Sequence, residues 1–307
     1  MTATLATLAA ALGRGEKAAL AGALAALERD PDGAATLALL DAAWRAPRAE
    51  VIGLTGPPGV GKSTLTGALI AEYRRRGRTV AVIAVDPSSR RSGGALLGDR
   101  VRLATDPEDG GIFVRSMAAR DRLGGLAGLT VSAMVLMRAL YDVVLIETVG
   151  VGQSETDVAA AADTVVFCVQ PGSGDSLQFM KAGIVEIPHI VVVTKADMGA
   201  AAARALTDVA AALGMAGDDS GWRVPVLALS ALNRDGVPAL LDALAARAAF
   251  LNSENRLARQ RHAQAGDWLA DAVRERFGRE GLRRAGSLAL PPGAPPFGRL
   301  KEILSHL

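Results

Sequence analysis

Short apolar runs alternate with helix-like stretches along the middle of the chain. Six runs show no alternation of apolar and polar residues, at 51–55, 79–86, 143–147, 164–170, 190–194 and 224–230. Continuous apolar strands separated by helices are typical of a parallel sheet that is covered on both faces. The pattern therefore predicts an α/β fold with a mostly parallel central sheet flanked by helices.

The first part of the chain shows a different pattern, without strand-like runs. Residues 1–47 are rich in Ala and Leu, and Leu37 and Leu40 lie at helical spacing. The Asp-Pro-Asp-Gly sequence at 30–33 divides this segment into at least two helices. We therefore expect a helical N-terminal extension at 1–47, followed by a sheet domain at 48–250.

After the last strand-like run, the sequence predicts a helical C-terminal arm at 251–307. Leu269, Val273 and Phe277 mark one face of a charged helix, and a Pro- and Gly-rich segment at 291–298 precedes a last short segment. Two interpretations of the arm stay open. It packs on its own domain, or it forms a contact with a second copy or another partner.

Composition supports a folded chain. Half of the 307 residues are hydrophobic and 4% are aromatic, so the core is expected to consist mainly of Ala, Leu and Val, and disorder is excluded as the main state. The formal net charge of +2 gives no electrostatic case for nucleic-acid binding. The single cysteine, Cys168, cannot form an internal disulfide, and the three scattered histidines lack metal-ligand spacing.

The apolar runs are also too short for a membrane protein. None approaches the ~18 residues that a spanning helix needs, and the N-terminus lacks the pattern of a signal peptide. We therefore expect a cytoplasmic protein without a membrane or nucleic-acid partner.

A phosphate-binding motif follows the first predicted strand directly. The motif G-x-x-x-x-G-K-[ST] is met by Gly56, Pro57, Pro58, Gly59, Val60, Gly61, Lys62 and Ser63, and Thr64 follows. In such a loop the backbone N–H groups surround the β-phosphate, and the next helix adds the positive end of its dipole. Lys62 is expected to reach the β- and γ-phosphates and Ser63 to bind Mg²⁺. The motif predicts a P-loop nucleoside triphosphatase.

Two later segments predict that the base is guanine. Thr194-Lys195-Ala196-Asp197 ends a strand and resembles the N-K-x-D motif of GTPases, in which the carboxylate accepts hydrogen bonds from guanine N1–H and the 2-amino group. Ser230-Ala231-Leu232 follows the next strand and matches the S-A-x loop that contacts guanine O6. Thr194 replaces the usual Asn, whose amide ties this loop to the phosphate loop, so a looser base site is expected.

Carboxylates that could hold Mg²⁺ occur after two strands. Glu147 and Gly150 occupy the positions of the Walker-B D-x-x-G motif, where the carboxylate holds the metal and the glycine N–H senses the γ-phosphate. Asp86 ends the strand at 79–86, and Asp99 follows a loop of small residues. Both aspartates suit Mg²⁺ coordination or water activation, and caps of helices and turns are the alternative explanation for each.

Together the motifs resemble one family, the MeaB/ArgK/MMAA-type G-protein chaperones of adenosylcobalamin-dependent methylmalonyl-CoA mutase. The resemblance covers residues 35–285 and includes the sequences G-P-P-G-V-G-K-S-T, E-T-V-G-V-G-Q-S-E and P-G-S-G-D-S-L-Q-F-M-K. It departs at Thr194, where Asn is usual, and at Asp121, where Gly is expected. The resemblance implies a homodimeric GTPase that binds GTP and GDP, gates loading of adenosylcobalamin into the mutase and helps to eject damaged cofactor.

The resemblance also implies roles for individual residues. Lys62 and Ser63 would bind phosphate and Mg²⁺, and Asp86, Asp99 and Glu147 would surround the metal and the attacking water. Asp197 would read the base. The segment 172–181 matches an additional switch of the family, in which Lys181 moves toward the nucleotide when the partner binds.

Two other classes of function remain as alternatives. The same scaffold would suit an ATP-dependent protein kinase or ATPase, although Asp197 has no good partner on adenine. A nucleotide-binding protein without turnover would leave the Mg²⁺ carboxylates without a role.

Overall fold

The structure is a computed structural model of the 307-residue chain. It describes residues 3–87, 103, 105–119, 128–150, 154–172, 187–214 and 221–307. The side chains at 86–87, 118–119 and 154–156 are outside the description.

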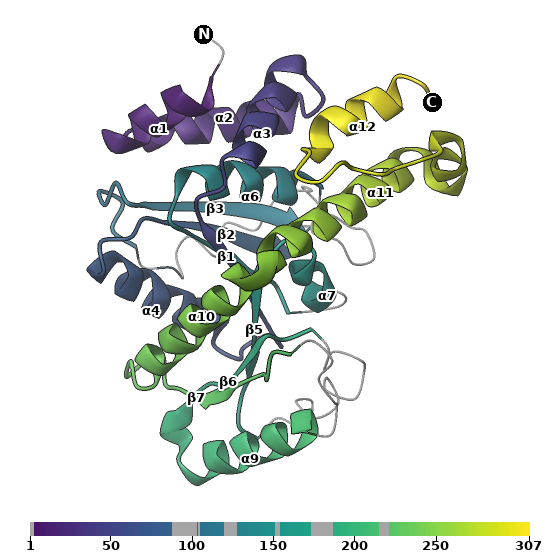
Figure 1. The fold of residues 1–307 in the computed structure, drawn as a ribbon. Coiled ribbons are helices and arrows are strands. Elements are labelled where there is room, and N and C mark those ends of the chain that lie inside the picture. Colours follow the sequence, from purple (N-terminus) through teal and green to yellow (C-terminus); the bar gives the residue numbers. More distant parts are fainter. Residues whose placement is uncertain are drawn as a thin grey trace.

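A parallel sheet forms the centre of the structure, and its described strands number seven, in the order β3-β2-β4-β1-β5-β6-β7 (Figure 1). The strands are β1 (Glu50–Thr55), β2 (Val80–Pro87), β3 (Ile112–Ala119), β4 (Val143–Glu147), β5 (Thr164–Val169), β6 (Ile190–Val193) and β7 (Val226–Ala228). Every neighbouring pair is parallel. The predicted α/β fold is therefore confirmed.

Strand β3 was not among the six runs that the sequence predicts. Its sequence, Ile-Phe-Val-Arg-Ser-Met-Ala-Ala, places Arg115 and Ser116 in the middle and small residues at the end. β3 lies at the edge of the sheet and pairs only with β2. The side chain of Arg115 extends to Glu28, in the helix at Lys17–Arg29, with 2.5 Å between Nη2 and Oε1. An edge strand needs fewer apolar residues, which is why the apolar pattern misses it.

The helices cover both faces of the sheet (Figure 1). They are α1 (Leu5–Gly13), α2 (Lys17–Arg29), α3 (Ala34–Arg45), α4 (Lys62–Arg75), α6 (Gly128–Leu140), α7 (Ser154–Ala159), α9 (Ala200–Gly214), α10 (Val237–Asn252), α11 (Arg256–Ala285) and α12 (Pro296–Leu304), with short 3₁₀ turns at η2 (Ala196–Met198) and η3 (Ser253–Asn255). On β4, Val144 and Ile146 join the apolar cluster of α6, whereas Val143 and Leu145 join that of α4 and α10. Both sides of the strand are buried, so its sequence shows no alternation.

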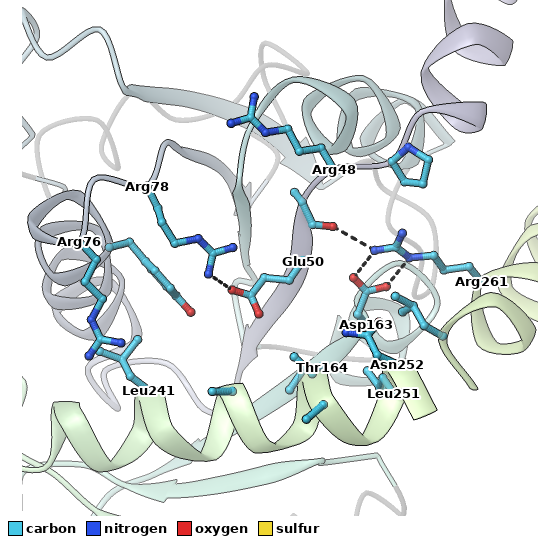
Figure 2. Close-up of a pocket in the computed structure, with 17 residues that line it drawn as sticks. Arg48, Glu50, Arg76, Arg78, Asp163, Thr164, Leu241, Leu251, Asn252 and Arg261 are labelled. Atoms are coloured by element: carbon cyan, nitrogen blue, oxygen red, sulfur yellow. Dashed lines mark hydrogen bonds and ion pairs between the residues drawn. The ribbon is translucent and has the colours of Figure 1, made fainter. Parts of the chain in front are cut away.

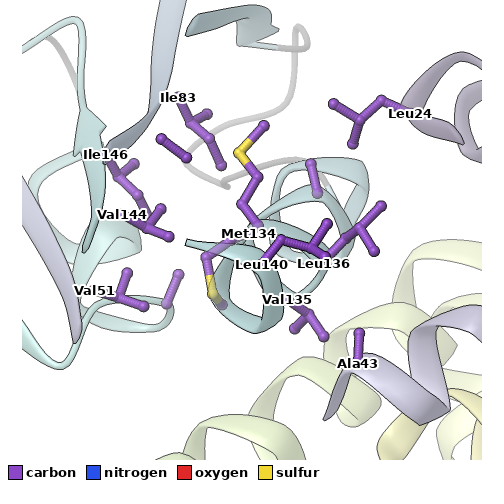
Figure 3. Packing of buried hydrophobic residues seen from close by; sticks show 14 of the residues in the cluster. Leu24, Ala43, Val51, Ile83, Met134, Val135, Leu136, Leu140, Val144 and Ile146 are labelled. Carbon is purple, nitrogen blue, oxygen red and sulfur yellow. The ribbon is translucent and has the colours of Figure 1, made fainter. Parts of the chain in front are cut away.

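Helix α6 connects the N-terminal helices to the sheet. Its residue Met134 points toward Ile83 of β2, and Val135 lies beside Ala43 of α3 (Figure 3). Leu24 of α2 belongs to the same buried cluster. The break between α2 and α3 falls at the Asp-Pro-Asp-Gly sequence, as predicted. The predicted extension at 1–47 therefore shares a continuous core with the sheet.

The C-terminal arm folds back along its own chain. Leu269 and Val273 of α11 are buried against Leu300 of α12, as the pattern predicts. Phe277 does not continue this face and is 44% exposed, because Gly278 interrupts the helix with a φ of 65°.

Polar side chains of α11 attach the arm to the turn between α7 and β5. Arg261 donates from Nε and Nη2 to the two carboxylate oxygens of Asp163, at 2.7 and 2.6 Å. Gln260 and Gln264 donate to the carbonyl of Ala162 at 3.1 and 2.9 Å. Within one chain the arm therefore packs on its own domain, and a contact with a second copy stays a prediction from the sequence. In the part of the chain that the structure describes, no helix has the length and apolarity to cross a membrane.

Candidate nucleotide-binding site

The predicted site residues that the structure describes gather at the carboxyl edge of the sheet. Thr55 ends β1, Glu147 ends the neighbouring β4, and Val193 ends β6. Parallel strands place these ends on one edge, and ligands of open α/β sheets bind there, where the strand order reverses. In this sheet the strand order reverses at β1. Strands β2, β3 and β4 lie on one side of β1, and β5, β6 and β7 lie on the other.

The phosphate loop requires glycine at its two ends. Gly56 has a φ of 131°, and a Cβ there would lie 2.2 Å from the carbonyl oxygen of Cys168 on β5. Gly61, with a φ of 103°, occupies the left-handed conformation that begins α4. Only glycine adopts such angles freely. The loop therefore curls tightly between β1 and the N-terminus of α4.

Lys62 lies under this loop and is 6% exposed. Its ammonium donates to the carbonyl oxygens of Gly56 and Pro57 at 2.7 and 3.0 Å. Buried ammonium groups are stabilised by such contacts. The charge is therefore held within the loop that the sequence assigns to the β- and γ-phosphates.

Glu147 is buried at the end of β4 and faces the first turn of α4. Ser63 Oγ donates to Glu147 Oε1 at 2.5 Å, and Thr66 Oγ1 donates to Glu147 Oε2 at 2.9 Å. Thr66 belongs to no motif in the sequence, although its position four residues after Lys62 places it on the same side of α4. The two hydroxyl groups fix the orientation of the carboxylate.

The hydroxyl of Ser63 and the carboxylate of Glu147 fit Mg²⁺. This ion prefers oxygen ligands, and it usually takes few from the protein because phosphates and waters complete its shell. Among the described residues, which omit Asp99 and the side chain of Asp86, no three His, Cys, Asp or Glu groups converge on one point. These two oxygen groups would suit a metal whose remaining ligands come from phosphates and water.

Gly150 of the Walker-B segment packs tightly against the phosphate loop. It has a φ of 81°, and a Cβ there would lie 2.0 Å from Gly56 O and 2.6 Å from Lys62 Nζ. No other residue fits this position without moving the loop. The backbone of the segment after β4 is thus in contact with the lysine that the sequence assigns to phosphate.

Thr194 connects the predicted base loop to the phosphate loop. Its hydroxyl lies 2.7 Å from the carbonyl oxygen of Val60 and 2.9 Å from that of Val169, and the residue is 2% exposed. In other GTPases an Asn at this position makes the connection between the two loops. Here the hydroxyl group of Thr194 makes it. Thr194 therefore joins the two loops without Asn, and the looser base site stays a prediction from the sequence.

Lys195 makes a second connection between the two loops. Its ammonium donates to Gly59 O at 3.1 Å and to the side-chain oxygen of Gln170 at 2.6 Å. Lys195 has a φ of 53°, a left-handed conformation that is uncommon for a residue with a Cβ. Gln170 follows β5 and was missed as a site residue, because a lone Gln after a strand carries no motif.

Asp197 and Ser230 belong to neighbouring loops and are hydrogen-bonded to each other. The Ser230 side chain lowers the pKa of the exposed Asp197 carboxyl, so this group is an ionised acceptor. Ser230 itself is 1% exposed, Ala231 is half-buried and packs against the α4 and α10 cluster, and Leu232 is 81% exposed. The two predicted base-reading segments therefore adjoin one another, with the carboxylate facing solvent.

Three predicted site residues cannot be placed in this arrangement. The backbone of Asp86 lies near the end of β2, beside Ala118 of β3, but its side chain is outside the described part of the structure. Asp99 and Lys181 fall in segments outside the described residues. Their roles remain predictions from the sequence.

Comparison with known proteins agrees with the fold and the motifs. A protein of Pyrococcus abyssi is 46% identical over 217 residues, which are 69% of this chain and 67% of that protein. The mouse methylmalonic aciduria type A homolog, a mitochondrial protein, is 37% identical over 228 residues, 73% of this chain and 55% of its own length. The crystal structure of a LAO/AO transport system kinase has a TM-score of 0.72 at 30% identity and covers 98% of this chain and 97% of that one.

The family model described as methylmalonyl-CoA mutase-associated GTPase MeaB matches residues 20–283. This match spans the sheet, the phosphate loop, the base loop and most of α11. The chain belongs to the MeaB family of methylmalonyl-CoA mutase-associated GTPases.

Proposed function

We propose that this GTPase gates the loading of adenosylcobalamin into a cobalamin-dependent acyl-CoA mutase, most directly methylmalonyl-CoA mutase, and helps to eject damaged cofactor. The observation that carries the proposal is the family match over residues 20–283. The similarity to the mouse methylmalonic aciduria type A homolog supports the same partner.

In this proposal Lys62, Ser63 and Glu147 form the phosphate and metal side of the site. The ammonium of Lys62 exchanges its contacts with the loop carbonyls for oxygens of the β- and γ-phosphates, where it stabilises charge that develops on the leaving phosphate. Ser63 and Glu147 hold Mg²⁺, which supplies electrostatic stabilisation of the phosphates when it is bound. Asp86 and Asp99 complete this side of the site by holding the metal and orienting the attacking water.

The base side of the site selects guanine through Asp197. An ionised carboxylate accepts two hydrogen bonds from the N1–H and 2-amino groups of guanine, and adenine offers neither in that arrangement. Lys195 lies along the ring with its aliphatic part, and the 230–232 loop contacts O6. This supports GTP as the substrate over the ATP that a kinase of the same scaffold would use.

The partner acts through the switch at 172–181 and through the dimer. In the complex Lys181 moves to the nucleotide and stabilises the transition state, as an arginine finger does. The C-terminal arm at 251–307 contributes to a homodimer. Lys181→Ala is expected to keep slow intrinsic hydrolysis and to lose the stimulation by the mutase, and Lys17→Ala, at a lysine of α2, serves as the control.

Cofactor transfer tests the proposal directly. Apo-mutase and adenosylcobalamin are mixed with the GTPase in the presence of GDP, GTP or a non-hydrolysable GTP analogue, and the cobalamin spectrum follows loading. We expect loading to depend on the nucleotide with the wild type and to become independent of it with Lys62→Ala. Identical loading in all nucleotide states with the wild type would overturn the gating role.

A further inference from the structure

A cleft of about 700 Å³ lies at the amino-terminal edge of the sheet, and Figure 2 shows the residues that line it. Its lining includes Glu50, the first residue of β1, and Thr164, the first residue of β5. The phosphate loop follows the other end of β1, after Thr55. The cleft is therefore separate from the nucleotide site, and its volume is in the range of small-molecule sites.

One wall of the cleft is an apolar face of α10. Leu241, Ala245, Ala248 and Ala249 line it at positions i, i+4, i+7 and i+8, which share one side of a helix. Figure 2 shows this helix running along the cleft, with Leu241 toward one end and Leu251 toward the other. The alanines leave space that larger side chains would fill.

The opposite wall is rich in arginine. The lining contains four arginines, Arg48, Arg76, Arg78 and Arg261, against two acidic residues, Glu50 and Asp163. Both acidic residues already have arginine partners. Arg78 binds Glu50 at 2.6 Å, and Arg261 binds Asp163 at 2.6 Å. The positive charge in excess is therefore that of Arg48 and Arg76.

Arg76 carries the larger part of this excess. Its Nε lies 3.0 Å from Glu72 Oε1, but Arg75 binds the same carboxylate through Nε and Nη2 at 2.9 and 2.5 Å. Arg75 and Arg76 therefore share the single negative charge of Glu72. Arg48 has a carboxylate of its own, Asp142, at 2.6 Å. The side chain of Arg76 is 42% exposed and stands at the same end of the cleft as Leu241 (Figure 2).

We propose that this cleft binds a small organic anion with an apolar body, whose phosphate or carboxylate group pairs with Arg76 while the body lies along the alanine face of α10. Guanidinium groups bind both kinds of anion through paired N–H donors. The apolar wall adds a contribution that depends on the area removed from water. The site goes beyond GTP hydrolysis and does not depend on the proposed role at the mutase.

Titration calorimetry with octyl phosphate, octanoate and octanol tests this assignment. The full-length protein is saturated with Mg²⁺ and GDP, so that the phosphate loop is occupied. We expect one molecule of an octyl anion to bind per chain, and octanol to bind at least about tenfold more weakly, as expected for the loss of one charge-assisted contact. Binding of octyl phosphate alone would identify phosphate esters as the ligands, whereas binding of both anions would include carboxylates.

Three variants connect binding to the cleft. Arg76→Gln is expected to weaken binding about tenfold, and Ala248→Leu is expected to abolish it by filling the space. Arg283→Gln, at an exposed arginine of α11 that pairs with Glu280, should bind as the wild type does. All three should retain basal GTP hydrolysis and wild-type thermal unfolding. Absence of anion binding, equal binding of octanol, or unchanged binding by both cleft variants would overturn the proposal.

Discussion

Replacing Thr194 by Val tests how the base loop and the phosphate loop are connected. Valine has the shape of threonine without the hydroxyl group, so the change removes the contact of 2.7 Å to Val60 O and adds no volume. The carbonyl of Val169 keeps its bond from the Thr194 backbone N–H, at 2.8 Å. The variant therefore removes one bond between the two loops with little other change.

The size of the effect follows from the burial of this bond. A buried hydrogen bond contributes about 1 kcal/mol, and an acceptor left without its partner costs about 1–3 kcal/mol. If 1–2 kcal/mol of this appears as misplacement of the base loop, the dissociation constant of GDP rises about 5- to 30-fold. Lys195 retains its contact to Gly59 O, so binding is weakened and not abolished.

Fluorescent GDP titration measures this change at saturating Mg²⁺. Thr207→Val is the matched control, because Thr207 lies on α9, away from both loops, and donates to Ala203 O at 3.1 Å. Thr194→Asn restores a polar side chain and should bind GDP nearly as the wild type does. If Thr194→Val binds GDP within twofold of the wild type and of Thr207→Val, the connecting role is refuted.

Three further predictions concern other parts of the structure. Asp197→Asn should weaken GTP binding by about tenfold or more, since two hydrogen bonds to an ionised acceptor are lost. The variant should favour XTP, whose 2-oxo group accepts a hydrogen bond from the new amide. An unchanged preference for GTP in competition binding would contradict the base assignment. Gly150→Ala places a Cβ 2.0 Å from Gly56 O and should lower GDP affinity at least about tenfold, as expected for loss of a contact worth 1.4 kcal/mol. Gly293→Ala, with a similar φ of 75° and open space, should not change the affinity. Burial lowers the pKa of His189 to about 3, so its neutral form stabilises the fold fully above about pH 6.5 and this contribution is lost toward pH 3. Urea denaturation at pH 7.5 and at pH 5.5 measures this loss of unfolding free energy. The loss between the two pH values should be about 1 kcal/mol smaller for His189→Asn than for the wild type.

Sequence patterns predicted the elements in which local chemistry and burial agree. β1 and β4 are buried on both faces, so their apolar runs are continuous, and the phosphate loop needs glycine and lysine at fixed positions. β3 escaped prediction because an edge strand accommodates Arg115. Phe277 was assigned to a buried face because periodicity does not report the interruption at Gly278.

The contacts between loops could not be predicted from the sequence. Thr194 was read as a loss of the usual Asn, because a motif describes residue types and not their partners. Its contact with Val60 joins segments separated by 134 residues. Thr66 and Gln170 were missed for the same reason, since their roles depend on Glu147 and Lys195, which approach them only in the folded chain.

GTP hydrolysis measured with and without methylmalonyl-CoA mutase is the most direct test of the proposed function. Phosphate release is followed at saturating GTP and Mg²⁺ while the mutase is titrated, with ATP as the alternative substrate. We predict slow hydrolysis of GTP by the chain alone, a rate that rises and saturates with the mutase, and little hydrolysis of ATP. A GTPase rate that the mutase leaves unchanged, or a preference for ATP, would contradict this prediction.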